Sequence, residues 1–179
     1  MILFQNEKLT VRKLELHDKQ SLLRWLTDPS VLQFYEGRDQ SFSLEMVEKK
    51  FYNRESGVER CLIEYDKKAI GYIQYYKVTD EELDLYGYFD KEQIIYGMDQ
   101  FIGEVDYWNK GIGTKLVSSM VKYLINEMHA TKIVMDPQIQ NNRAIACYEK
   151  CGFKKIKLLP KNELHEGEFR DCWLIEYAK

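Results

Sequence analysis

The chain has 179 residues, and its 26 lysines and arginines against 29 aspartates and glutamates give a formal net charge of −3. A share of 45% hydrophobic and 13% aromatic residues excludes a disordered chain, and the length predicts a single domain, residues 1–179. The acidic balance argues against a nucleic-acid partner, and no apolar run approaches the roughly 18 residues of a membrane span. Because the N-terminus also lacks the pattern of an export signal, we expect a cytoplasmic protein without membrane attachment.

The four cysteines predict neither disulfides nor a metal site. A chain of this size with a good core does not need disulfides, so free thiols in a reducing compartment are expected. Cys147 and Cys151 are four residues apart and would share one face of a helix. No histidine or second cysteine pair lies near enough in the sequence to complete a zinc site, and we expect no metal.

The first quarter of the chain predicts one strand followed by helices. Alternating apolar and polar residues over 9–14 indicate a half-exposed strand. Asp18 is expected to cap a first helix, and Asp28 followed by Pro29 is typical of the cap and first turn of a second, short helix. Ser43 is expected to open a third helix.

The middle of the chain changes to the period of strands. Residues 61–65 and 69–76, separated by a polar turn, predict a hairpin. Between residues 79 and 92 stand six acids and one base, which predicts a solvated loop or part of an anionic funnel. The apolar segment 94–102 then predicts a central strand in which Gly97 marks a bulge and Asp99 is an isolated charge.

The last part alternates helices and strands. Apolar residues over 112–125 recur with helical spacing and lead to a short strand at 131–135, which predicts a parallel strand–helix–strand unit with the strand before it. A further helix is expected over 141–150, and two final strands near 153–159 and 172–177.

A glycine-containing loop precedes the helix at 112–125 and reads Tyr107-Trp108-Asn109-Lys110-Gly111-Ile112-Gly113-Thr114. Glycines let a ligand approach the backbone, and the free N–H groups of a helix start favour phosphate or pyrophosphate. A dinucleotide-binding loop would need a third glycine where Leu116 stands, and a P-loop would need a different order of residues from Gly113-Thr114-Lys115. A plain turn at a helix start is the alternative.

A second motif reads Asn141-Asn142-Arg143-Ala144-Ile145-Ala146-Cys147-Tyr148-Glu149-Lys150-Cys151-Gly152-Phe153. Together with the loop, it resembles the Gcn5-related N-acetyltransferase (GNAT) family, whose pattern has Asn, then Ala, then Tyr-x-Lys-x-Gly-Phe. The resemblance implies an α/β (α+β) fold with a central, mixed and splayed sheet flanked by helices, and acetyl-coenzyme A as cosubstrate. It implies cofactor contacts from Trp108, Asn109, Lys110, Gly111, Ile112, Gly113, Thr114, Asn141, Ala144 and Tyr148. Where the family often has Gln or Arg, this chain has Trp108, so pyrophosphate binding is expected from backbone N–H groups.

Further segments extend the likeness over nearly the whole chain, among them Trp25-Leu26-Thr27-Asp28, Phe34-Tyr35-Glu36-Gly37-Arg38-Asp39, Tyr96-Gly97-Met98-Asp99-Gln100-Phe101-Ile102-Gly103-Glu104 and Glu163-Leu164-His165-Glu166-Gly167. They resemble the aminoglycoside 6′-N-acetyltransferases, in particular the acetyltransferase half of the bifunctional acetyltransferase–phosphotransferases. That resemblance implies a small polycationic aminoglycoside as substrate. The alternatives are a protein N-terminal acetyltransferase of the ribosomal-protein type, and a non-catalytic module that binds coenzyme A or aminoglycosides. The sequence says nothing of the oligomeric state.

Acetyl transfer to an amine needs a proton acceptor at the amine and a proton donor for the departing thiolate. Asp99 is the candidate acceptor, because an idle charge in an apolar strand is costly; the alternative is a structural aspartate with an internal partner. Tyr148 is the candidate donor, placed by the family pattern, and the alternative is an aromatic side chain that only packs.

Substrate binding is assigned to residues that offer negative charge or an aromatic ring. Asp136 follows a strand end, where it binds a second amine or caps the turn before Pro137. The full set assigned to the substrate is Asp99, Asp136, Tyr35, Glu36, Glu166 and Asp171. For the acids near the C-terminus, ordinary solvated surface is the alternative.

Overall fold

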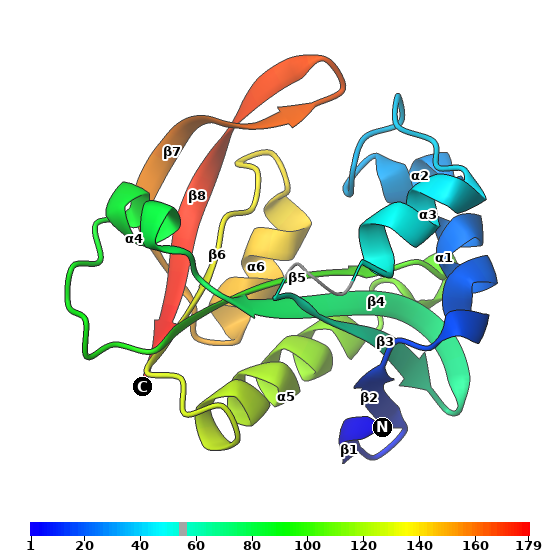
Figure 1. The fold of residues 1–179 in the computed structure, drawn as a ribbon, viewed down its shortest axis with the longest axis horizontal. Coiled ribbons are helices and arrows are strands. Elements are labelled where there is room, and N and C mark those ends of the chain that lie inside the picture. The colour runs from blue at the N-terminus through cyan, green and yellow to red at the C-terminus, as the bar shows by residue number, and fades with distance from the viewer. Residues whose placement is uncertain (54–56) are drawn as a thin grey trace. The chain divides into compact units, whose positions relative to one another are not determined.

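The structure, a computed structural model, describes residues 1–53 and 57–179. In this part of the chain, eight strands form a mixed sheet in the order β1-β2-β3-β4-β5-β6-β8-β7 (Figure 1). The strands are β1 (Ile2–Asn6), β2 (Leu9–Lys13), β3 (Glu59–Tyr65), β4 (Lys68–Lys77), β5 (Ile95–Ile102), β6 (Lys132–Met135), β7 (Lys154–His165) and β8 (Glu168–Ala178). The α-helices are α1 (Lys19–Trp25), α2 (Pro29–Leu32), α3 (Leu44–Phe51), α4 (Asp80–Tyr86), α5 (Ile112–Asn126) and α6 (Asn142–Lys150), and the 3₁₀ helices include η1 (Leu16–Asp18) and η3 (Val105–Tyr107). The predicted fold class, a mixed sheet flanked by helices, is confirmed.

The chain divides into two compact units, each built from separate stretches of the sequence. Unit 1 contains Met1–Gln74, Asp99–Gly113 and His165–Glu168, and unit 2 contains Tyr75–Met98, Thr114–Leu164 and Phe169–Lys179. The strands β4, β5, β7 and β8 and the helix α5 therefore contribute residues to both units. Each unit has its own hydrophobic cluster. Whether residues 1–179 act as one domain stays a prediction.

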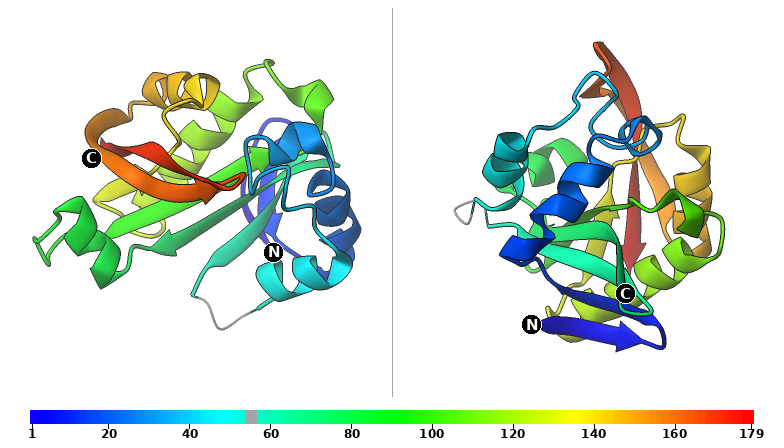
Figure 2. Two further views of the ribbon diagram at one scale, coloured as in Figure 1. Left: turned by 90° about the horizontal axis from the view of Figure 1, so that it is seen from above. Right: turned by 90° about the vertical axis from the view of Figure 1, so that its right-hand side faces the viewer.

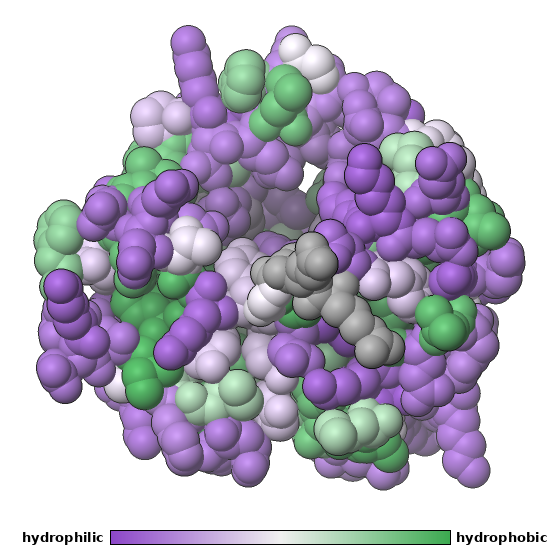
Figure 3. Space-filling model, in the orientation of Figure 1, coloured by the Kyte–Doolittle hydropathy of each residue, from purple (hydrophilic) through white to green (hydrophobic). Residues whose placement is uncertain are grey.

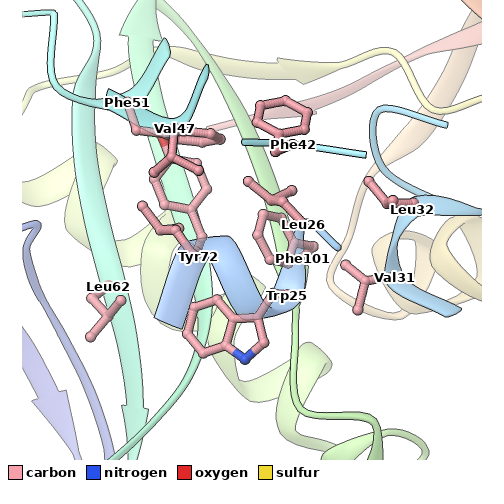
Figure 4. Packing of buried hydrophobic residues seen from close by; sticks show 11 residues of the cluster. Trp25, Leu26, Val31, Leu32, Phe42, Val47, Phe51, Leu62, Tyr72 and Phe101 are labelled. Carbon is pink, nitrogen blue, oxygen red and sulfur yellow. The ribbon is translucent and has the colours of Figure 1, made fainter. Parts of the chain in front are cut away.

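Unit 1 has a core formed by three helices on three strands. Its buried residues are Leu22, Trp25 and Leu26 of α1, Val31 and Leu32 of α2, Phe42, Val47 and Phe51 of the segment with α3, Leu62 of β3, Tyr72 of β4 and Phe101 of β5 (Figure 4). Aromatic side chains meet edge to face at its centre: the rings of Phe51 and Tyr72 are 5.0 Å apart at 88°. The core thus fixes the direction in which β4 and β5 present their side chains.

The helix starts of unit 1 confirm two of three predicted caps. Asp28 accepts a hydrogen bond from the Ser30 N–H before α2, and Ser43 accepts one from the Met46 N–H before α3. Asp18 directly precedes α1 as expected, but it makes no cap hydrogen bond to that helix. Its carboxylate instead accepts two hydrogen bonds of 2.8 Å from the guanidinium of Arg12. The charge of the partly buried Arg12 guanidinium competes better for this carboxylate than a helix N–H does.

Unit 2 confirms the predicted parallel strand–helix–strand arrangement. After α5 the chain enters β6, which pairs in parallel with β5, Ile95 opposite Lys132 and Gly97 opposite Val134. This register has no shift at Gly97, so the predicted bulge is absent from this ladder. The glycine is needed for another reason, since a Cβ there would lie 2.6 Å from the ring of Tyr76.

Four further elements differ from the sequence expectation. The acidic segment predicted to be a loop contains the helix α4, because Thr79 and Glu82 form a capping box at its start and Gly87, at φ 83°, ends it. An unpredicted strand, β1, pairs with β2. The two C-terminal strands are longer than expected and meet at Glu166 and Gly167 (Figure 2).

Candidate active site

Asp99 lies on β5 in unit 1, where it is partly buried. Its Oδ2 accepts a hydrogen bond of 2.9 Å from Nε2 of Gln74 on β4. The Oε1 of the same amide accepts a hydrogen bond of 2.8 Å from the hydroxyl of Tyr72. The donor of this hydrogen bond is a neutral amide, so the bond itself does not cancel the negative charge of Asp99.

The predicted cofactor loop precedes α5 and has an unusual backbone. Asn109 and Gly111 adopt positive φ angles of 58° and 75°. The indole N–H of Trp108 donates a hydrogen bond of 2.8 Å to the carbonyl of Ile102, so this side chain anchors the loop. The Nζ of Lys110 lies 5.8 Å from the ring centre of Tyr107.

The first turn of α5 suits an anionic ligand. The N–H groups of Ile112, Gly113 and Thr114 begin a helix of 15 residues, and such groups have no partner within the helix itself. Their partial positive charge favours a phosphate or pyrophosphate. A Cβ added to Gly111 would meet no atom within 4 Å, so this glycine is required by its backbone angle and leaves open space beside it.

The second motif forms α6 in unit 2. Asn141 is its N-cap, and its Oδ1 accepts a hydrogen bond of 3.4 Å from the Ala144 N–H. Tyr148 lies farther along the helix, half-buried, with its ring 6.3 Å from that of Phe153. Asn141 therefore has a structural role at the helix start, and its cofactor contact stays a prediction.

Sulfur contacts bring α6 beside the beginning of α5. The Sγ of Cys147 lies 3.5 Å from Oγ1 of Thr114, and the Ser118 hydroxyl donates to Sγ of Cys151 at 3.4 Å. Burial raises the pKa of the Cys147 thiol, which opposes its use as a nucleophile. Within unit 2 the structure thus places α6 beside Thr114, the last residue of the loop motif, and beside Ser118 of α5.

Three carboxylates of unit 2 gather around a buried thiol. Cys172 is fully buried, and its pKa is raised to about 12, first by burial and further by the charges of Asp136, Glu163 and Asp171. Asp136 and Asp171 were predicted as substrate ligands and are brought together here. Glu163 belongs to one of the segments that extend the family likeness, but it was not among the predicted substrate ligands. We call these three residues the carboxylate cluster.

The recorded hydrogen-bond donors of the carboxylate cluster are neutral. Asp136 accepts from the side-chain amide of Asn162 at 2.9 Å, and Asp171 accepts from the Lys161 backbone N–H at 2.8 Å. Glu163 accepts from the amide of Gln138 at 3.0 Å. These three hydrogen bonds hold the carboxylates in place without themselves cancelling their charges.

The other predicted substrate ligands have internal partners in unit 1. Glu166 accepts hydrogen bonds of 2.6 Å and 2.8 Å from Nε and Nη2 of Arg38, and Glu36 pairs with Lys50. Tyr35 packs its ring 4.5 Å from that of Phe101. Contacts of these three side chains with a substrate stay predictions.

The predicted site residues therefore fall into two groups. Unit 1 carries Tyr35, Glu36, Asp99, Trp108, Asn109, Lys110, Gly111, Ile112, Gly113 and Glu166, and unit 2 carries Thr114, Asp136, Asn141, Ala144, Tyr148 and Asp171. Sequence reasoning missed Gln74, although it is the single amide among the apolar and aromatic residues 69–76 of β4, a signal of the same kind as Asp99. Among the described residues, no three His, Cys, Asp or Glu side chains form a metal-binding group, and no helix is both long and apolar enough to cross a membrane.

The surface is mainly hydrophilic on the face drawn in Figure 3, where apolar side chains form separate patches. Exposed large apolar residues belong to several elements of the described chain, among them Leu85, Phe89, Leu164 and Phe169. Isolated apolar side chains are normal on a protein surface.

Comparison with known proteins shows which proteins this chain is similar to. The acetyltransferase (GNAT) domain family matches residues 15–160. An aminoglycoside N(6′)-acetyltransferase type 1 of Klebsiella pneumoniae is 30% identical over 155 residues, which cover 84% of this chain and 76% of that protein. An N-alpha-acetyltransferase of Saccharolobus solfataricus is 40% identical over 70 residues, 39% of this chain and 40% of that protein. The solved structure of AAC(6′)-Ib with ribostamycin and coenzyme A superimposes with a TM-score of 0.78 at 25% identity and covers 97% of this chain and 94% of that one.

Proposed function

Because the chain belongs to the acetyltransferase (GNAT) domain family, we propose that it transfers the acetyl group of acetyl-coenzyme A to the 6′-amine of an aminoglycoside antibiotic. The chain is an acetyl-coenzyme A-dependent N-acetyltransferase. Its relative from Klebsiella pneumoniae, an aminoglycoside N(6′)-acetyltransferase, matches 84% of it at 30% identity, which supports the choice of acceptor. An enzyme with this activity confers drug resistance.

The observation that carries the choice of acceptor is the carboxylate cluster. Asp136, Glu163 and Asp171 lie around one thiol and accept their recorded hydrogen bonds from neutral groups. An aminoglycoside carries several ammonium groups, so it gains several favourable charge contacts from such a cluster. A peptide N-terminus carries a single positive charge and would use only part of it.

Acetyl-coenzyme A fits the first turn of α5 and the loop before it. The N–H groups of Ile112, Gly113 and Thr114 are oriented to bind its pyrophosphate, and the left-handed backbone at Gly111 leaves space for that approach. Bound there, the coenzyme supplies the acetyl thioester. The side chain of Trp108 holds the loop rather than the phosphates.

In this proposal Asp99 acts on the acceptor amine. The amine arrives mostly as an ammonium ion, and the negative carboxylate binds it and takes up a proton, directly or through water. The amide of Gln74 occupies Oδ2 without cancelling the charge. The free amine that results is the nucleophile.

Tyr148 acts on the leaving group. Its hydroxyl supplies a proton to the departing thiolate of the coenzyme, as the family pattern implies. Tyr148 shares α6 with Cys147, whose raised pKa disfavours a covalent acetyl-cysteine route. Direct transfer from thioester to amine is therefore proposed.

The proposal is tested by product analysis with purified protein. Free thiol release is measured with acetyl-coenzyme A and kanamycin, and the product is examined by mass spectrometry and NMR. We expect one acetyl group, located on the 6′-nitrogen. Acetylation at another nitrogen would contradict the regiochemistry, and no turnover with kanamycin, tobramycin or ribostamycin would contradict the aminoglycoside assignment.

Protein N-terminal acetylation is the second candidate, favoured by the 70-residue match to an N-alpha-acetyltransferase. A peptide that carries the N-terminal sequence of a ribosomal protein is the competing acceptor. We expect kcat/KM for kanamycin to exceed that for the peptide by more than about 100-fold, since the peptide lacks most of the cationic contacts. The reverse order would favour the second candidate.

The same proposal treats residues 1–179 as one N-acetyltransferase domain, because the family match from residue 15 to 160 includes parts of both units. It places the enzyme in the cytoplasm, where acetyl-coenzyme A is available. The four free cysteines suit that reducing compartment.

A further inference from the structure

We propose that Gln74 is a positioning residue for the acetyl transfer: its side-chain amide, held in one orientation by the hydroxyl of Tyr72, fixes the carboxylate of Asp99 in the direction in which it meets the substrate amine. This inference rests on the role of Asp99 in the proposed function. It adds two residues, Gln74 and Tyr72, that the sequence motifs do not contain.

The three side chains form one continuous chain of hydrogen bonds within unit 1. Tyr72 and Gln74 are two residues apart on β4, so they project from the same face of the strand. Asp99 stands on β5, the next strand in the sheet. The Tyr72 hydroxyl lies 2.8 Å from Oε1 of Gln74, and Nε2 of Gln74 lies 2.9 Å from Oδ2 of Asp99.

The aromatic ring of Tyr72 is a rigid anchor for this chain. It is completely buried in the hydrophobic cluster of unit 1. The ring of Phe51 meets it edge to face at 5.0 Å, and the ring of Phe101 lies 5.8 Å away (Figure 4). A ring packed on these sides cannot turn freely, so the position of its hydroxyl is set by the core.

The Tyr72 hydroxyl also decides which end of the Gln74 amide faces Asp99. Burial raises the pKa of Tyr72, so the hydroxyl stays protonated in the working pH range and donates to Oε1. A flipped amide would place Oε1 against the carboxylate, where two acceptors repel each other. The arrangement observed is thus the one that satisfies both hydrogen bonds.

A fixed carboxylate is valuable to the reaction because orientation limits proton transfer. The bond from Gln74 holds Oδ2 of Asp99 and restricts the rotation of the carboxylate. Loss of that bond removes one constraint on the rotamer of Asp99 and lowers the fraction of molecules that present the carboxylate productively. A neutral amide performs this task without neutralising the charge that binds the ammonium.

A double-mutant cycle tests the proposal. The variants Gln74→Leu, Asp99→Asn and the double variant are compared in kcat/KM for kanamycin at saturating acetyl-coenzyme A. We expect Gln74→Leu to lose about 10-fold and Asp99→Asn at least about 100-fold. In the Asp99→Asn background, Gln74→Leu should cost less than about 2-fold, because it acts through the group already removed.

The cycle separates failure of this inference from failure of the proposed function. If Asp99→Asn loses activity while Gln74→Leu has its full effect in both backgrounds, Gln74 does not act through Asp99 and the positioning role is wrong. A fully active Asp99→Asn variant would overturn both proposals. Melting temperature and coenzyme A affinity are measured for each variant to identify any that does not fold.

The variant Tyr72→Phe tests the same chain from its far end and keeps the ring that the core needs. We expect a loss of about 3-fold in kcat/KM, and no additional loss when it is combined with Gln74→Leu. Tyr88→Phe is the matched control, since the hydroxyl of Tyr88 donates to the carboxylate of Glu176 in unit 2. The control should alter stability only, and an equal loss of activity in both variants would contradict the proposal.

The variant Gln74→Glu adds a measurement, the pH–rate profile, that would not change if Gln74 had only a structural role. It replaces the donor with a second carboxylate beside Asp99, so the acidic limb of the pH–rate profile should move to higher pH by about one unit. The charged and titratable groups that act on the Tyr72 hydroxyl are Arg60, Cys61 and Asp99, and the guanidinium of Arg60 also forms a hydrogen bond with it. An unchanged profile in a folded Gln74→Glu variant would overturn the proposal.

Discussion

Two carboxylates of unit 1 have opposite environments. Glu166, at the turn between β7 and β8, accepts hydrogen bonds from the guanidinium and the backbone N–H of Arg38. These bonds lower the pKa of Glu166 to about 2. Asp99, in the middle of β5, accepts its recorded hydrogen bond from the neutral amide of Gln74.

The difference gives a criterion for the role of a carboxylate, namely whether its hydrogen-bond donor is charged or neutral. An arginine cancels the charge of Glu166 locally, so an incoming ammonium gains little from it. The amide of Gln74 orders Asp99 without itself cancelling the charge, which supports the proposed role of Asp99 at the substrate amine. By the same criterion the carboxylate cluster resembles Asp99, whereas Glu36, paired with Lys50, resembles Glu166.

The largest effect is expected from Asp99→Asn. Asparagine keeps the shape and removes the charge, so kcat/KM for kanamycin should fall by about 100-fold or more. Raising the pH should restore part of the rate, since more of the amine then arrives unprotonated. The pH–rate profile and the melting temperature are the measurements. A destabilised variant with the wild-type pH–rate profile would indicate that Asp99 has a structural role. The proposed difference in role between Asp99 and Glu166 would then be wrong.

A smaller effect, on kcat alone, is expected from Tyr148→Phe. The change removes a proton donor and no charge, so kcat should fall by about 10- to 100-fold while KM for the aminoglycoside stays unchanged. Single-turnover rates measure the chemical step directly. An unchanged rate where chemistry limits turnover would leave Tyr148 as a packing residue against Phe153.

A substitution in the carboxylate cluster should weaken the binding of the aminoglycoside. Asp136→Asn removes one charge and keeps a group that can bond to Asn162, so KM for kanamycin should rise about 10-fold with little change in kcat. The salt dependence of KM should also weaken, because fewer charge contacts are screened. An unchanged KM and salt dependence would show that the cluster does not bind the drug.

The smallest effect on activity is expected from Glu166→Gln, with kcat/KM for kanamycin changed by less than about 3-fold, as for other solvent-exposed ion pairs. The substitution should instead change the stability of the folded protein at acidic pH. The pKa of Glu166 is lowered on folding, so its stabilisation is present above its ordinary pKa of 4.5 and is lost as the pH falls towards 2. Thermal melts across this range should therefore show a weaker pH dependence in the variant. A loss of activity as large as that of Asp99→Asn would invalidate the comparison.

Local sequence was sufficient for most elements and for the family. The caps at Asp28 and Ser43 use residues within three positions of the donor, so sequence alone predicts them. The loop before α5 and the motif of α6 were recognised because their residues are contiguous. The helix α4 was missed although its capping box, Thr79 with Glu82, is also local and visible in the sequence.

The sequence by itself therefore determined which charged and aromatic residues are candidates for the site and which elements carry them. The isolated charge of Asp99 is one of these candidates. Only the tertiary structure decided which charges are neutralised: Arg38 and Glu166 are separated by 128 residues, and Arg12 takes the carboxylate of Asp18 that the sequence assigned to a helix cap. The same holds for Gln74, which reaches Asp99 from 25 residues away. Pairing across strands depends on the packing of the whole sheet, and no local pattern encodes it.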